Sequence, residues 1–96
     1  MNNKIKKEDF DKIEKLVKII IDAYSQTKVN KEITELEYMG RKISDNNALN
    51  IFSNLVNCSK EASKKITTNF PLSEKNKWKM AALQELSKLK TYVSEE

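Results

Sequence analysis

Apolar residues in the first quarter of the chain recur at the spacing of an α-helix. They fall at alternating intervals of three and four positions, which places them on one face: Phe10, Ile13, Val17, Ile20 and Tyr24. Glu8 and Asp9 stand in the first turn, where the helix dipole favours negative charge. The pattern predicts a helix over residues 7–28 with this face in a core. Acidic residues are interleaved with the lysines on the opposite face, which favours a core helix over an interfacial membrane helix.

A second helix is predicted after Asn30, whose side chain can cap it. Its apolar face contains Ile33, Leu36, Met39 and Ile43. Gly40 either lies inside this helix, where it lets a neighbouring element approach closely, or follows its last turn as a C′ residue. The sequence leaves both positions open. The polar stretch 44–47 (SDNN) is typical of a capping turn before the next helix.

A third helix is predicted over residues 46–68. Its apolar row runs Ala48, Phe52, Leu55, Ser59, Ala62 and Ile66. The second half of this helix has small residues (Ser59, Ala62 and Ser63) where the first half has large ones, which lets another helix pack closely there. Cys58 flanks the row, and the chain has no histidine to activate it, so we interpret it as a structural thiol.

The segment NFPLSEKNKWKMAALQELSKLK, residues 69–90, contains the only proline and the only tryptophan of the chain. Pro71 prevents the third helix from continuing and favours an extended Phe70. Ser73 is predicted to cap a fourth helix, with Glu74 in its first turn. The segment therefore predicts a tight corner between two helices.

The buried row of the fourth helix is predicted to be Trp78, Ala82, Leu86, Leu89 and Val93. Met80 and Leu83 are expected beside this row. Phe70 and Leu72 are expected to close over the end of the bundle.

Composition agrees with a helical fold. The chain of 96 residues has one glycine and one proline, whereas a sheet of this size needs frequent turns, so few connections between long helices are expected. We predict an all-α fold, an antiparallel four-helix bundle, in a single domain over residues 1–96. The single cysteine excludes an intrachain disulfide, and the charged N-terminus lacks a signal-peptide pattern, so we expect an intracellular protein. The longest apolar run, residues 19–21, is far shorter than the ~20 residues of a membrane span.

Residues that carry out common enzyme chemistry are scarce. The chain has no histidine, one cysteine and one glycine, which excludes an imidazole base, the common zinc sites and a glycine-rich phosphate loop. Carboxylates at helical spacing (Asp9 and Asp11, Glu32 and Glu35) lie on polar faces and are interpreted as solvated charge. We therefore expect no enzymatic activity, no catalytic residue, no metal site and no cofactor.

The charge of the chain is mildly positive. Eighteen basic and fourteen acidic residues give a net charge of +4, and Arg41 is the only arginine. This lysine bias disfavours sequence-specific recognition of nucleic acid, which relies on the planar fork of arginine. Lysines flank the predicted corner between the third and fourth helices: Lys60, Lys64, Lys65, Lys75, Lys77 and Lys79. They are interpreted first as solubilising residues, and alternatively as a basic end that meets an anionic membrane surface or an acidic partner.

The segment ASKKITTNFPLSEKNKWKMAALQELSKLK, residues 62–90, consists of a helix end, a short turn, Leu-Ser and a helix with a Leu-x-x-Leu-Ser ladder. In this, and in the number and order of its helices, the chain resembles the immunity proteins of pediocin-like (class IIa) bacteriocins, the enterocin A immunity-like family. The resemblance implies a cytoplasmic, non-enzymatic four-helix bundle that gives resistance to a membrane-permeabilising peptide. The implied partner is the toxin-bound mannose phosphotransferase permease, at its cytoplasmic side, with peripheral association at the inner face of the membrane left open.

The resemblance also implies that discrimination between toxins lies in the C-terminal half of the chain. Family members often carry a longer tail after the last helix than the few residues present here, so recognition by a tail is not implied. The candidate recognition residues are the following, all expected to be exposed: Phe70, Lys75, Lys77, Lys79, Lys88, Lys90 and Tyr92.

Two other classes of function compete with this one. In a small helical DNA-associated or phage-type regulator, the fourth helix would enter the groove with Lys75, Lys77 and Lys79 on phosphates. The predicted turn contains proline and no glycine, which is unlike the usual helix-turn-helix connection. The third class is a scaffold or dimerising bundle without a ligand.

Overall fold

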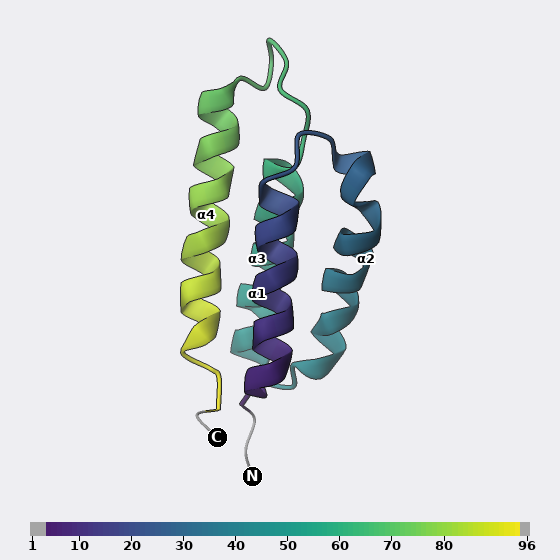
Figure 1. Cartoon of the computed structure of the whole chain (residues 1–96). Helices are drawn as coiled ribbons and strands as arrows, with labels where there is room; N and C mark the ends of the chain where they lie inside the picture. The colour runs from purple at the N-terminus through teal and green to yellow at the C-terminus, as the bar shows by residue number, and fades with distance from the viewer. Residues whose placement is uncertain (1–3, 95–96) are drawn as a thin grey trace.

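Four α-helices form the described part of the chain, residues 4–94 of the computed structural model. They are α1 (Lys7–Ile21), α2 (Asn30–Tyr38), α3 (Asn46–Ala62) and α4 (Leu72–Lys90), with two short 3₁₀ helices, η1 (Gln26–Val29) and η2 (Met39–Lys42). Figure 1 shows that successive α-helices run in opposite directions. The predicted all-α bundle is confirmed.

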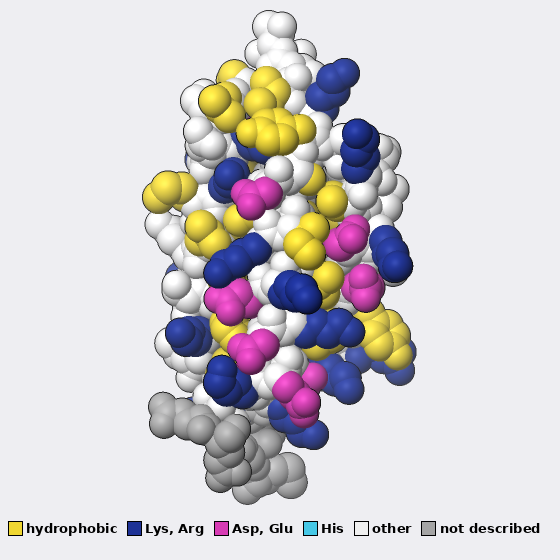
Figure 2. Space-filling view, viewed as in Figure 1, with side chains coloured by type: hydrophobic (Ala, Val, Ile, Leu, Met, Phe, Trp, Pro, Cys, Tyr) yellow, Lys and Arg dark blue, Asp and Glu magenta, His cyan; other side chains and the backbone are white. Residues whose placement is uncertain are grey.

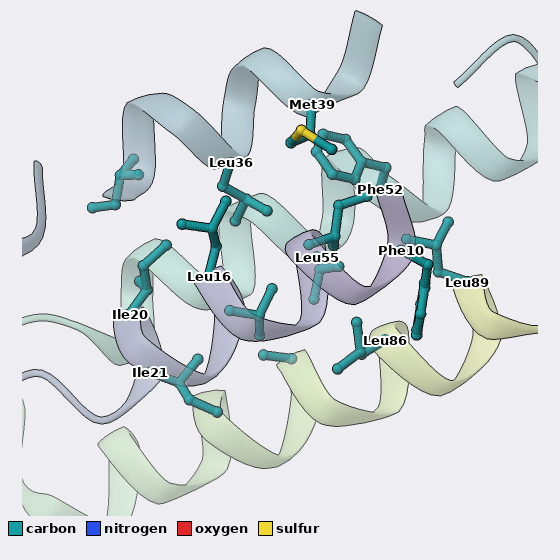
Figure 3. Packing of buried hydrophobic residues seen from close by; sticks show 14 of the residues in the cluster. Phe10, Leu16, Ile20, Ile21, Leu36, Met39, Phe52, Leu55, Leu86 and Leu89 are labelled. Carbon is teal, nitrogen blue, oxygen red and sulfur yellow. The ribbon is translucent and has the colours of Figure 1, made fainter. Parts of the chain in front are cut away.

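The core is formed by the apolar faces that the sequence pattern predicts for the first three helices. Phe10, Ile13, Val17 and Ile20 of α1 are buried. So are Ile33 and Leu36 of α2, and the row of α3 from Ala48 to Ala62. Figure 3 shows side chains from all four helices meeting in one cluster. Among residues 4–94, no helix is both long enough and apolar enough to cross a bilayer.

The first helix is shorter than predicted. It ends at Ile21, and Tyr24 is 60% exposed, so the placement of Tyr24 in the core is wrong. Asp22 and Ser25 follow, and side chains of these types compete with the helical backbone for hydrogen bonds. The chain then turns through η1 and returns to the core at Val29.

The second helix and its ends differ in detail from the prediction. Asn30 is the first residue of α2, and the structure shows no side-chain cap there. Gly40 lies beyond α2 in η2 and does not have a positive φ, so it is not a left-handed C′ residue. A Cβ at this position would lie 3.2 Å from Cε2 of Phe52, so the close approach is real. The capping turn before α3 is confirmed, because Asp45 Oδ2 accepts a 2.9 Å hydrogen bond from the Ala48 amide.

The third helix ends at Ala62, and Ile66 is 36% exposed, so its predicted burial is wrong. Ser63 ends the helix by donating its hydroxyl to the carbonyl of Lys60 at 2.7 Å. The β-branched run Ile66-Thr67-Thr68 has low helix propensity, which agrees with the early ending. The connection therefore spans residues 63–71 and is not the tight corner that was predicted.

The fourth helix begins two residues earlier than predicted, at Leu72 instead of Glu74. Pro71 occupies the N-cap position, and its carbonyl accepts the amides of Glu74 and Lys75 at 3.0 and 3.1 Å. The structure shows no side-chain cap at this terminus, so the capping role of Ser73 is wrong. Glu74 does lie in the first turn.

The predicted core row of α4 is correct only in its centre. Ala82, Leu86 and Leu89 are buried, whereas Trp78 and Val93 are half-buried. Three side chains expected in or over the core are exposed: Leu72 (50%), Met80 (62%) and Leu83 (41%). The helix thus presents a mixed surface of apolar side chains and lysines to solvent.

The first described residues pair with the last ones. Ile5 donates its amide to the Tyr92 carbonyl at 2.9 Å, and its own carbonyl accepts the Ser94 amide at 2.8 Å. The side chain of Ile5 is 1% exposed and joins the core. This pairing connects the segment before α1 to the segment after α4 through backbone hydrogen bonds.

Candidate functional site

Lys75 is the most deeply buried charged side chain in the described chain, with 1% exposure. Its ammonium donates to the carbonyls of Ala23 and Ala62. It also lies 4.7 Å from the ring centroid of Tyr24, which is a cation–π distance. Ala23 follows the end of α1 and Ala62 is the last residue of α3, so one side chain of α4 joins three helices.

The burial of Lys75 has a clear electrostatic basis. The last carbonyls of a helix have no partner inside the helix and carry the negative end of its dipole. An ammonium has three donors and a positive charge, so it binds the terminal carbonyl of α3, on Ala62, and the carbonyl of Ala23 just after α1 at the same time. The pKa of Lys75 is lowered by its burial and by the neighbouring charge of Lys79, and Asp22 opposes this by raising it.

The expectation that Lys75 is an exposed recognition residue is therefore wrong. A signal for its burial was present in the sequence. Lys75 lies three residues before Trp78 and seven before Ala82, so it extends the core row of α4 by one turn. The burial was not predicted because lysine is rarely buried without partners. The partners of Lys75 come from distant parts of the chain, so local sequence does not indicate them.

The other lysines around the α3–α4 connection are mostly paired. Lys79 lies 3.2 Å from Asp22, Lys60 lies 3.5 Å from Glu37, and Lys64 lies 2.9 Å from Glu61, in each case between ammonium and carboxylate. Lys65 and Lys77 are exposed and form no ion pair with any described residue. The basic end predicted from the sequence thus has fewer free charges than its lysine count indicates.

The connection between α3 and α4 forms a closed turn at the end of the bundle. The Thr67 amide donates to the Phe70 carbonyl at 2.9 Å, and the Phe70 amide donates back to the Thr67 carbonyl at 3.1 Å. We call residues 64–72 the α3–α4 tip. Four apolar residues of the tip meet solvent: Ile66, half-buried Phe70, Pro71 and Leu72. Figure 2 shows hydrophobic side chains gathered on the surface near this end of the molecule.

The remaining candidate residues lie at the other end of α4. Lys88 pairs with Glu85 at 3.1 Å, Lys90 is exposed beside a shallow groove between α1 and α4, and Tyr92 is half-buried in the pairing with Ile5. About 13 residues of helix, or ~20 Å, separate this group from Lys77. The seven candidates therefore do not form one continuous site.

The described residues offer little for catalysis. No group of three or more metal-binding side chains occurs among residues 4–94. Cys58 is half-buried, and its pKa is raised by burial and by the negative charges of Glu85 and Glu61. A raised pKa leaves less of the nucleophilic thiolate at neutral pH.

No protein-family model, curated protein or solved structure matches this chain.

Proposed function

We propose that this protein is an immunity protein of the pediocin-like bacteriocin type. It protects the cell by binding, at the cytoplasmic side of the membrane, to the mannose phosphotransferase permease when a bacteriocin peptide occupies it. The protein acts by recognition, with no catalytic step. Its binding surface is formed mainly by exposed residues of α3, α4 and their connection.

One observation carries this proposal. The segment that resembles the family, residues 62–90, forms the connection and α4, and α4 packs along α3 more extensively than any other pair of described helices. This packing uses one side of α4 and leaves Met80, Leu83 and Lys77 facing solvent. The segment thus combines a firmly held helix with a surface that the fold itself does not use, as a binding element requires.

The DNA-binding alternative loses most of the residues on which it depends. It assigned Lys75, Lys77 and Lys79 to phosphates. Lys75 is buried and Lys79 pairs with Asp22, so only Lys77 of the three is exposed and without an ion pair among the described residues. Duplex binding with a steep salt dependence would favour the alternative over our proposal.

The proposal is tested by expressing the protein in a bacteriocin-sensitive cell that has the permease. We expect resistance to one or a few pediocin-like peptides and unchanged sensitivity to unrelated pore-forming peptides. Exchange of α3 and α4, with their connection, for those of another immunity protein should transfer the specificity, whereas exchange of α1 should not. Unchanged sensitivity to every pediocin-like peptide, with the protein folded and abundant in the cell, would reject the proposal.

Single substitutions locate the surface within this half of the chain. Phe70→Ala should reduce protection more than Lys77→Ala or Lys90→Ala, because large apolar groups usually contribute more to binding than mobile, hydrated lysines. Lys12→Ala, an exposed lysine on α1, is the control. Each variant is compared at equal amounts of folded protein, measured by circular dichroism and immunoblot.

A further inference from the structure

The α3–α4 tip combines apolar and basic side chains with no negative charge of its own. Residues 62–73 (ASKKITTNFPLS) contain two lysines and no acidic residue. Ile66 is 36% exposed and Leu72 is 50% exposed. Phe70, which lies between them along the chain, is half-buried. Tyr24, packed against Lys75 at the same end of the bundle, is exposed as well.

The shape of the tip suits a flat partner rather than a peptide ligand. Figure 1 shows the connection projecting beyond the ends of the helices, so it is convex. The two hydrogen bonds between Thr67 and Phe70 satisfy four backbone groups inside the turn, and the Thr67 hydroxyl accepts a further bond from the Phe70 amide at 3.1 Å. Pairing these four backbone groups lowers the free-energy cost of moving the turn from water to a membrane interface.

Two positive charges near the tip form no ion pair with a described residue, and one negative charge, Glu74 in the first turn of α4, lies beside them without an ion pair as well. Lys65 lies within the tip. Lys77 lies on α4, about 7.5 Å along the helix axis from Leu72, the last residue of the tip. Neither lysine forms an ion pair with a described residue, so both charges are available to an external anion. Apolar side chains beside unpaired lysines are the combination that binds the headgroup region of an anionic bilayer.

We propose that the α3–α4 tip docks on the surface of an anionic lipid bilayer. Its apolar side chains lie at the boundary between headgroups and acyl chains, and Lys65 and Lys77 face lipid phosphates. The docked protein stands on the membrane with its long axis directed away from it. This contact requires neither a toxin nor a receptor, so it goes beyond the proposed function and is tested separately from it.

The test is co-sedimentation of the full chain with vesicles of phosphatidylglycerol and phosphatidylcholine in equal amounts. We expect binding that weakens as salt is added and is absent with pure phosphatidylcholine. The double variant Ile66→Ser/Leu72→Ser should bind roughly tenfold or more weakly, because two apolar side chains no longer leave water. Tyr38→Ser, which removes a 58% exposed apolar side chain at the other end of the bundle, should bind like the wild type.

A matched charge variant separates the tip from the general positive charge of the protein. Lys65→Gln/Lys77→Gln should weaken binding roughly tenfold or more, since each lysine near an anionic surface contributes several-fold to affinity. Lys12→Gln/Lys42→Gln makes the same change in net charge on exposed lysines away from the tip and should have a smaller effect. Equal weakening by both pairs would mean diffuse attraction and would overturn the proposal.

Insertion is measured with a single tryptophan placed in the tip by Phe70→Trp in a Trp78→Phe background. Its emission should shift to the blue on anionic vesicles and be quenched by brominated acyl chains. No binding to anionic vesicles at low salt would also overturn the proposal. If the tip variants then lost protection in cells without any lipid binding, the tip would contact a protein, and the immunity function would survive the failure of the lipid proposal.

Discussion

The two ends of α4 are fastened to α1 by different means. At its beginning, the buried ammonium of Lys75 donates to the Ala23 carbonyl, and Lys79 pairs with Asp22. At its end, backbone hydrogen bonds connect Ile5 with Tyr92 and Ser94, and the Ile5 side chain enters the core. The first connection depends on the charged side chains of Lys75 and Lys79, whereas the second depends on backbone groups and apolar burial. The two ends should therefore respond differently to mutation and to pH.

Lys75→Ala should cause the largest loss of stability. It leaves the carbonyls of Ala23 and Ala62 without their partner and opens a cavity where the lysine stem lay, so we expect a loss of about 3–5 kcal/mol. Urea denaturation measures the loss, and hydrogen exchange should show faster opening around Ala23 and Ala62. The control is Lys77→Ala, which removes an exposed lysine and should change stability by less than ~0.5 kcal/mol. Equal effects of the two substitutions would contradict the role of Lys75.

Ile5→Ala should cause a smaller loss, about 2–3 kcal/mol, from the cavity alone. The backbone hydrogen bonds to Tyr92 and Ser94 do not need the side chain, so the pairing itself should persist. Exchange should increase near residues 5 and 92–94 and remain unchanged near Ala23. Ile19→Ala, at an isoleucine that is 43% exposed, is the matched control. If Ile5→Ala increased hydrogen exchange along the whole of α4, the two ends of the helix would open together and not independently.

The stability that depends on Lys75 should change with alkaline pH. Burial lowers the pKa of Lys75, with a further contribution from Lys79, while Asp22 raises it. Between this lowered value and the ordinary lysine pKa of about 10.4, the unfolded chain binds more protons than the folded one. The stability of the wild type should therefore rise with pH through this window, relative to Lys75→Met, which has no proton to lose.

This comparison is made by urea denaturation at intervals from about pH 8 to 10.5, with the two proteins otherwise identical in sequence. The neutral amine retains two donors for the two carbonyls, so deprotonation does not break the connection. If the free energy of unfolding of the wild type fell relative to that of Lys75→Met as pH rises, the prediction would be contradicted. The attraction between the ammonium and its partners would then exceed the cost of burying its charge.

Ser73→Ala should have the smallest effect, less than ~0.5 kcal/mol, because Ser73 does not cap α4. Asp45→Ala is the positive control, since Asp45 does cap α3 and its loss should cost about 1 kcal/mol. The thermal unfolding midpoints of Ser73→Ala and Asp45→Ala, each compared with that of the wild type, measure the two losses of stability. A loss at Ser73 as large as that at Asp45 would mean that the beginning of α4 depends on its serine as well as on Lys75.

The sequence pattern predicted the helices and most of the core because local periodicity reports which face of a helix is buried. The rows of α1 and α3 were correct over their central turns. The ends of these helices were wrong, because Tyr24 and Ile66 continue the apolar period beyond the residues at which the backbone turns. Periodicity does not distinguish a longer helix from an exposed apolar residue in a connection.

The candidate site was less predictable for a different physical reason. Lys75 has the right spacing for the core of α4, but its burial depends on carbonyls 52 and 13 positions away along the chain. The pairing of Ile5 with Tyr92 joins opposite ends of the described chain and leaves no local pattern. Contacts of this kind are set by the assembled bundle. The exposed lysines that remain, Lys77 and Lys90, were identified from the sequence, and their role in recognition stays a prediction.

The pairing of Ile5 with Tyr92 and Ser94 also gives the molecule two unlike poles. Figure 1 shows α1 beginning and α4 ending at one pole, while the α3–α4 connection lies at the other, along a molecule 49 Å in its longest dimension. A fluorescent reporter or an affinity handle fused at either end of the described chain would be held at the same pole, on the far side of the bundle from the tip. Fluorophores can therefore be fused at both ends at once, so that the distance between them reports opening of the Ile5 pairing, while the opposite pole stays exposed to solvent.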